Sequence, residues 1–174
     1  MVPIHYICLN AHARESLAWY LCYRYVGDRT TCEMLAMAMD VEVEKPEMPG
    51  DEGVSDVLAD AAMYAQEQDV ATAIEDPFAI QRAKDVRILI ECMDRKRRYG
   101  AAIDRIECAE MAPLLGGEPA SVSEGNAQLC AAILERRLED APVIQYLTRK
   151  AYRDEWLYQP AAKIYPDRFW ADLD

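Results

Sequence analysis

Residues 76–100 read DPFAIQRAKDVRILIECMDRKRRYG and carry the clearest helix signature of the chain. Asp76 suits the N-cap, and Pro77 suits the first helical position because its missing N–H would have no partner there. The four bases at 95–98 lie where the helix dipole favours cations, and Gly100 is a suitable stop. Apolar residues recur at helical spacing at Phe78, Val86, Leu89, Ile90 and Met93. These signals predict a helix over 77–99.

The same kinds of signal predict helices on both sides. Asn10 and Gly27 bracket one helix, and TTCE at 30–33 reads as a capping box that opens a short helix ending near Asp40. Further helices are expected over 54–74, over 101–111 before Pro113 and the glycines at 116 and 117, from the capping box at Ser121, and from Pro142 to before Pro160. Alanine, leucine and glutamate are plentiful while threonine and phenylalanine are scarce, which favours helix over sheet.

A chain of 174 residues, 52% of them hydrophobic, is long enough to bury a core in one domain. We therefore predict an all-α, single-domain helical bundle of about five to seven helices over residues 1–174. A short extended N-terminal arm is expected at 2–9. An exposed acidic loop is expected at 41–53, where VEVE alternation is also typical of an edge strand. Residues 116–120 are the candidate for a break between subdomains.

The negative charge is concentrated in one quarter of the chain. The net charge is −12, and segment 33–76 holds thirteen acids against one base, Lys45. In the predicted helix over 54–74, one arc is apolar and is expected to face the core: Val54, Val57, Leu58, Ala61, Ala62 and Ala65. The opposite arc is acidic: Glu52, Asp56, Asp60 and Glu67. Acids four residues apart on a helix repel one another, so this stripe costs stability unless a partner compensates it.

A field of this kind repels nucleic acid and anionic membranes and attracts basic protein surfaces. We therefore predict an acidic protein-binding module rather than an enzyme, with no direct contact to nucleic acid or membrane. If the partner handles nucleic acid, binding would inhibit it by mimicking nucleic-acid charge. Small acidic phage-encoded inhibitors are similar to this chain in composition, although no motif is shared. The predicted partner-binding residues are Glu42, Glu44, Glu47, Asp51, Glu52, Asp56, Asp60 and Glu67.

Two alternatives remain open at this stage. The first is a helical structural or adaptor subunit that forms homo-oligomers through exposed aromatic side chains. Its candidate interface residues are Trp19, Tyr23, Phe169 and Trp170. The second is a metal-dependent all-α nucleotide hydrolase, because Asp56 and Asp60 with Glu67 are loosely similar to the acidic motifs of such enzymes.

The remaining motifs predict no catalytic residue, cofactor or metal site. His12 with Glu15 makes only a two-ligand pair, and the six cysteines never occur as Cys-x-x-Cys. We expect these cysteines to be buried thiols in a reducing compartment. The N-terminal residues lack the pattern of a secretory signal, and no stretch approaches 18 uncharged apolar residues. These features predict a soluble, cytoplasmic protein.

Overall fold

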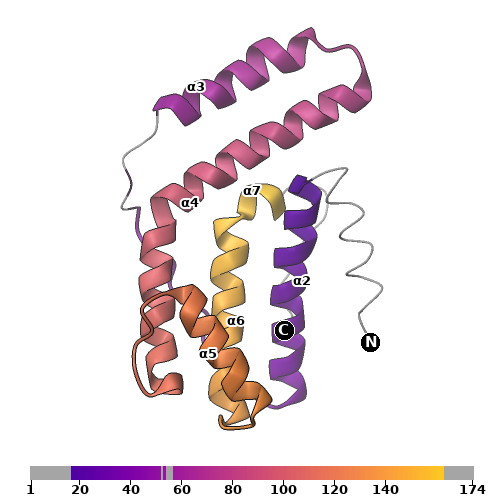
Figure 1. Ribbon diagram of the computed structural model, residues 1–174. Helices are drawn as coiled ribbons and strands as arrows, with labels where there is room; N and C mark the ends of the chain where they lie inside the picture. Colours follow the sequence, from indigo (N-terminus) through magenta and orange to yellow (C-terminus); the bar gives the residue numbers. More distant parts are fainter. Residues whose placement is uncertain (1–16, 52, 54–56, 163–174) are drawn as a thin grey trace.

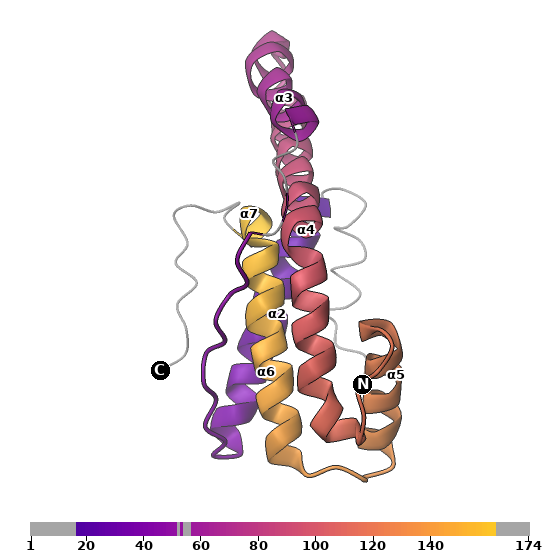
Figure 2. The same ribbon diagram turned by 90° about the vertical axis from the view of Figure 1, so that its left-hand side faces the viewer.

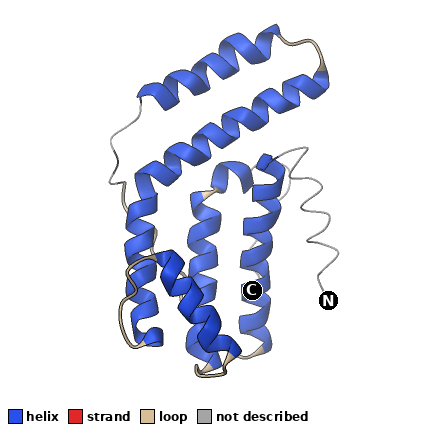
Figure 3. Cartoon of the chain, viewed as in Figure 1, coloured by secondary structure: helices blue, strands red, loops and turns tan. Residues whose placement is uncertain are grey.

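The computed structural model describes residues 17–51, 53 and 57–162. Within these residues the secondary structure is helical, and no strand is present (Figure 3). The α-helices are α2 (Leu17–Ala38), α3 (Val57–Ala65), α4 (Pro77–Leu115), α5 (Val122–Leu134), α6 (Asp140–Leu157) and α7 (Gln159–Ala162). The predicted all-α, single-domain bundle is confirmed, whereas the predicted N-terminal arm at 2–9 lies outside the described residues. None of the described helices is both long and apolar enough to cross a membrane.

Three helices form the body of the molecule. α2, α6 and the C-terminal half of α4 run side by side, and α5 packs across α4 (Figures 1 and 2). α7 covers one end of this bundle. Met111, Leu129 and Tyr146 form the main buried cluster, which joins α4, α5 and α6. Met111 precedes the loop at 116–120, where a break between subdomains was predicted, and Leu129 and Tyr146 follow it. The helices on both sides of this loop therefore share one buried cluster.

α2 is one continuous helix, which corrects the prediction of two helices separated near Gly27. The expected capping box does not form, because the hydroxyls of Thr30 and Thr31 donate within the helix to the carbonyls of Val26 at 2.8 Å and Gly27 at 2.7 Å. A glycine inside a helix costs only about 1 kcal/mol relative to alanine. Packing of α2 against α6 and α7 outweighs that local cost.

α4 begins as predicted but does not end at Gly100. The Asp76 carboxylate accepts a hydrogen bond from the backbone N–H of Phe78 at 3.1 Å, and Pro77 follows at the first helical position. The helix then continues for 39 residues to Leu115, with Pro113 in its last turn and Gly116 at φ +78° as its C-cap. At 1.5 Å per residue its length is about 58 Å, longer than the bundle. Burial of Ala102 and Ile103 after Gly100 explains why the helix continues into the bundle.

The N-terminal half of α4 leaves the bundle and forms an arm with α3 (Figure 1). A π-helical turn at Gln66–Val70 and a 3-10 turn at Ala71–Ala73 replace the end of the predicted helix over 54–74. The apolar arc of that helix was predicted to face the core, and this prediction is wrong: Val57 and Leu58 are 76% and 79% exposed. α3 has no buried residue and contacts only α4 and the π-turn among the described elements. The arc is apolar, but no other helix among the described residues covers it.

Candidate functional site

An extended acidic segment, residues 41–51, crosses the outside of the bundle along α6 (Figure 2); we call it the strap. It starts where α2 ends, with the backbone N–H of Val41 donating to the carbonyl of Ala36 at 2.9 Å. The apolar residues of the strap are half-buried, although the sequence predicted an exposed loop at 41–53. These residues are Val41, Val43, Pro46, Met48 and Pro49. The strap is extended without strand pairing.

Three of the predicted binding residues are exposed on the strap. Glu42 and Glu44 are exposed between half-buried valines, as expected when an extended backbone turns alternate side chains to opposite sides, and Glu47, three residues further on, is also exposed. None of the three carboxylates forms an ion pair with a described residue. The strap therefore presents to solvent three carboxylates that no described residue pairs.

Side chains of the bundle hold the strap in place. The Gln145 side-chain amide on α6 donates to the carbonyl of Glu42 at 3.0 Å. The ammonium of Lys45, which is the one base in segment 33–76, lies 5.6 Å from the centre of the Tyr152 ring. At the far end Asp51 forms an ion pair with Arg98 of α4. The strap thus combines an ordered backbone with outward acids.

The other predicted acids lie elsewhere or are already paired. Asp51 is bound to Arg98, and this hydrogen bond holds the pKa of the Asp51 carboxyl below its ordinary value. Glu67 lies on the arm, 3.5 Å from the guanidinium of Arg87, and Asp60 is exposed on α3 of the arm. Glu52 and Asp56 lie outside the described residues. The structure therefore divides the predicted set between the strap and the arm.

Glu33, the first acid of segment 33–76, is buried. Its carboxylate accepts hydrogen bonds from Arg29 at 2.6 Å and from the hydroxyl of Tyr152 on α6. Arg29 is also paired with Glu155. These contacts fasten α2 to α6, so Glu33 contributes to the fold and not to the surface charge.

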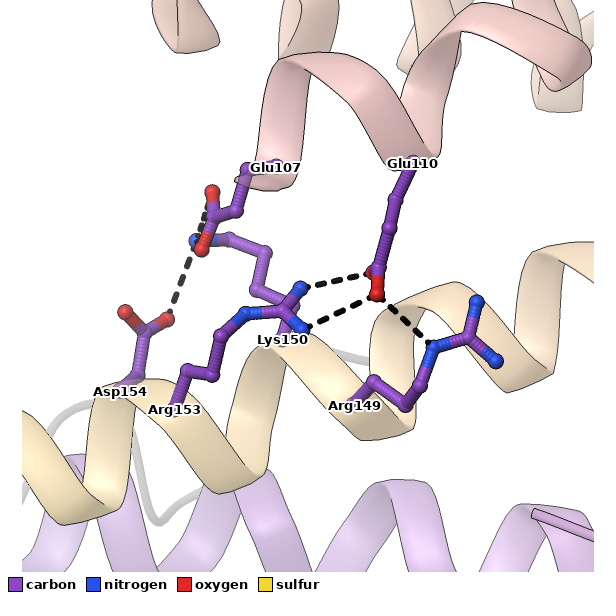
Figure 4. Close-up of polar contacts among 6 residues, drawn as sticks. All are labelled: Glu107, Glu110, Arg149, Lys150, Arg153 and Asp154. Carbon is purple, nitrogen blue, oxygen red and sulfur yellow. Dashed lines mark hydrogen bonds and ion pairs between the residues drawn. The ribbon is translucent and has the colours of Figure 1, made fainter. Parts of the chain in front are cut away.

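A second polar cluster joins α4 to α6, and Figure 4 shows its six side chains. Lys150 donates to both oxygens of Glu107 at 3.0 and 2.9 Å and lies 3.1 Å from Asp154. Arg153 binds both oxygens of Glu110, which also accepts from Arg149 at 3.1 Å. Three carboxylates thus face three cations.

Burial shapes the protonation of this cluster. Desolvation raises the pKa of the Glu107 carboxyl, and Lys150 partly opposes this shift. Desolvation also raises the pKa of Tyr146, whose buried hydroxyl has no hydrogen-bond partner, and the Nε of Arg153 likewise has none. Such groups are costly to bury, so the cluster contributes more to the orientation of the helices than to net stability.

The sequence reasoning missed Glu107 and Glu110, although their i, i+3 spacing places both on one face of a helix. That spacing also occurs in acidic metal-binding motifs, but here each carboxylate is bound by a cation of α6. Among the described residues, no group of three or more His, Cys, Asp or Glu side chains is arranged to hold a metal ion. The cluster is best described as a neutral set of ion pairs between helices.

The aromatic residues proposed as an interface are only partly described. The rings of Trp19 and Tyr23 on α2 lie 4.2 Å apart, and both side chains are half-buried. Phe169 and Trp170 lie outside the described residues. Other aromatic contacts are internal: Tyr25 stacks on Tyr158 at 4.2 Å, so it helps to join α2 to the end of α6.

Comparisons of the chain with models of known protein families, with curated proteins and with solved structures found no match.

Proposed function

We propose that the protein is a binding module whose acidic strap engages a basic surface of a protein partner. The observation that carries this proposal is the outward position of Glu42, Glu44 and Glu47 on a segment that the bundle holds in place. A fixed strap loses little conformational entropy on binding, which favours affinity. The charges also accelerate encounter with a basic partner.

The arrangement supports a partner that handles nucleic acid. Residues two positions apart on an extended backbone are separated by about 6–7 Å along the strand, and Glu42 and Glu44 have this spacing in the sequence. A phosphate-binding surface recognises a series of closely spaced negative charges, and Glu42, Glu44 and Glu47 provide such a series. In this refinement the module competes with nucleic acid for the same basic surface. The described cysteines carry free thiols, in keeping with a reducing, cytoplasmic setting.

The proposal can be tested with a lysine- and arginine-rich peptide as a defined basic probe. Binding is measured by fluorescence anisotropy at about 50 mM and about 300 mM NaCl. We expect E42Q/E44Q/E47Q to bind about tenfold more weakly than the wild type at low salt, because three exposed charge pairs are lost. Salt should weaken the wild type more than the variant.

A matched control removes the same charge from another face. D104N/E118Q/E124Q neutralises three exposed acids on α4, the following loop and α5. This control should bind within about twofold of the wild type if position matters more than net charge. Equal losses in both triple variants would show that only net charge attracts the probe, and the strap would then not be the site.

The second candidate function is that of a structural subunit that self-associates. The exposed apolar residues of the arm favour this function. α3 exposes Val57, Leu58 and Tyr64, and the adjoining half of α4 exposes Phe78. The acids of α3 and its π-turn would meet the bases of α4 if two arms packed side by side in opposite directions. Light scattering should then show a dimer that Leu58→Asp converts to a monomer. A monomeric wild type at about 100 μM would exclude this function, because a physiological dimer is populated at that concentration.

A further inference from the structure

An apolar groove of about 800 Å³ lies at the end of the bundle opposite the arm. The C-terminal turn of α2, the end of α5 and the start of α6 form its walls. Its apolar lining includes Leu35, Met39, Ile133, Leu138, Val143 and Leu147. A groove of this volume accommodates several large side chains.

Three of the apolar side chains that line this groove are exposed, whereas Val143 and Ile144 of the same lining are buried. Leu35, Met39 and Ile133 are 44%, 45% and 41% exposed although they line the same hollow. Met34, Met37 and Leu134, next to them in the sequence, are also exposed. Exposed apolar side chains that line one groove mark an interaction site, and methionine adapts readily to a bound partner.

The rim of the groove is acidic. Glu139 and Asp140 line it with a single base, Arg136, and Asp40 follows directly after Met39. The strap begins directly after Asp40, and the Gln145 side chain of α6 donates a hydrogen bond to the carbonyl of Glu42. Apolar groove and acidic strap are therefore neighbouring parts of one surface.

We infer that the groove binds an amphipathic helix of a protein partner, with apolar side chains on the helix face that enters it and lysine or arginine on the flanks. This inference rests on the proposed function and specifies the form of the basic partner. A helix that places apolar residues at i, i+3 or i+4, and i+7 can insert them into an apolar groove, and basic flanks match the acids of the rim and Glu42. A second copy of the chain fits less well, because a symmetric dimer through this groove would bring two acidic rims together.

The probe for this inference is a labelled 18-residue peptide with leucines at helical spacing and lysines on the flanks. A peptide of the same composition in scrambled order retains the charge but has no apolar face. We expect the full chain to bind the ordered peptide at least about tenfold more tightly than the scrambled one, as read by anisotropy. Equal affinities would show attraction by charge alone and would overturn the inference.

Substitutions in the groove test the apolar contact separately from charge. Leu35→Asp and Ile133→Asp each add a negative charge, which on its own would attract a basic peptide more strongly. We expect each to weaken binding of the ordered peptide by about tenfold or more. The bound peptide would cover the new carboxylate and remove it from water, which is costly. Met93→Asp adds the same charge at an exposed apolar position of α4 outside the groove, and it should leave the affinity within about twofold of the wild type. Circular dichroism confirms that each variant is folded.

The strap variant separates the two proposals. If E42Q/E44Q/E47Q weakens peptide binding while the groove variants do not, the groove inference fails and the proposed function stands. If the groove variants weaken binding while the strap variant does not, the strap is not the binding site. The inference that the partner helix carries basic flanks is then overturned. If the wild type is a dimer that Ile133→Asp dissociates, or if the peptide binds only after removal of residues 1–16 or 163–174, the groove belongs to another occupant and the inference is also overturned.

Discussion

The guanidinium of Arg153 is fully buried and donates to both carboxylate oxygens of Glu110, at 3.2 and 2.8 Å. The two residues come from α6 and α4, so this ion pair crosses the interface between the helices (Figure 4). Its partners are separated by 43 positions in the sequence. The contact fixes how the two helices are aligned, because the paired geometry is lost if either helix slides or turns.

Removing one partner of this pair should be strongly destabilising. Glu110→Gln leaves the Arg153 charge buried without its carboxylate, and we expect a loss of about 2–4 kcal/mol in the free energy of unfolding. Urea denaturation followed by circular dichroism measures the loss. Glu118→Gln, in the exposed loop after α4, should change the stability by less than about 0.5 kcal/mol. A similarly small effect of Glu110→Gln would mean that water replaces the carboxylate at Arg153.

The stability of the protein should depend on pH through Glu107. Desolvation raises the pKa of this carboxyl, with partial opposition from Lys150, so the folded state binds its proton more tightly than the unfolded state. The contribution of Glu107 to stability therefore falls as the pH rises from the ordinary pKa of the carboxyl through its raised pKa in the folded state. We expect the wild type to gain stability relative to Glu107→Gln when pH is lowered from 7 towards 4.5. A relative loss on acidification would show that Lys150 dominates instead.

Two glycines inside helices should respond oppositely to the same substitution. A Cβ at Gly125 would lie 2.5 Å from the Cε of Met111 and 2.8 Å from the Cγ of Pro119, whereas nothing lies within 4 Å of a Cβ at Gly27. We expect Gly27→Ala to stabilise by about 0.5–1 kcal/mol, since alanine loses less backbone entropy. Gly125→Ala should destabilise by about 1–3 kcal/mol through overpacking. Thermal melts compare the two, and stabilisation by both would show that the Met111 side chain moves aside at little cost.

The cysteines should differ widely in reactivity. Burial raises the pKa of the Cys22 and Cys92 thiols to about 11 from 9.0, whereas Cys130 is exposed on α5. The thiolate is the reactive form, so a two-unit rise lowers its population about 100-fold at pH 8. With iodoacetamide and peptide mapping we expect Cys130 to be modified first and the two buried thiols at least about 100-fold more slowly. Denaturant should abolish the difference.

The arm should open more easily than the bundle. α3 has no buried residue and is connected to the rest of the described structure through α4 and the π-turn. Its amide protons should therefore exchange through local opening of low free energy, while those of α6 require disruption of the core. Hydrogen exchange with mass spectrometry should show faster exchange over 57–65 than over 143–157. Equal protection would indicate that another chain covers α3 in solution.

Local signals in the sequence determined the class of the fold and several helix boundaries. Asp76 with Pro77 begins α4, and the Ser121 hydroxyl accepts from the backbone N–H of Glu124 at the start of α5, as the capping box predicts. These contacts involve residues two or three positions apart, so no distant part of the chain is needed to form them. The acidic segment at 41–53 was also predicted to be a loop, but the half-burial of Val41 and Val43 was not.

Only the tertiary structure decided where helices continue and which faces are covered. Gly27 and Gly100 are local stop signals worth about 1 kcal/mol each, and packing of the flanking turns outweighs them. Periodicity identifies the apolar arc of α3 but not whether another helix lies against it, and the fold leaves that arc exposed. Glu107 and Glu110 acquire their cations only when α6 packs on α4, and the apolar groove exists only where α2, α5 and α6 meet. Such features depend on residues far apart in the chain, whose encounter is set by the free energy of the whole packed core.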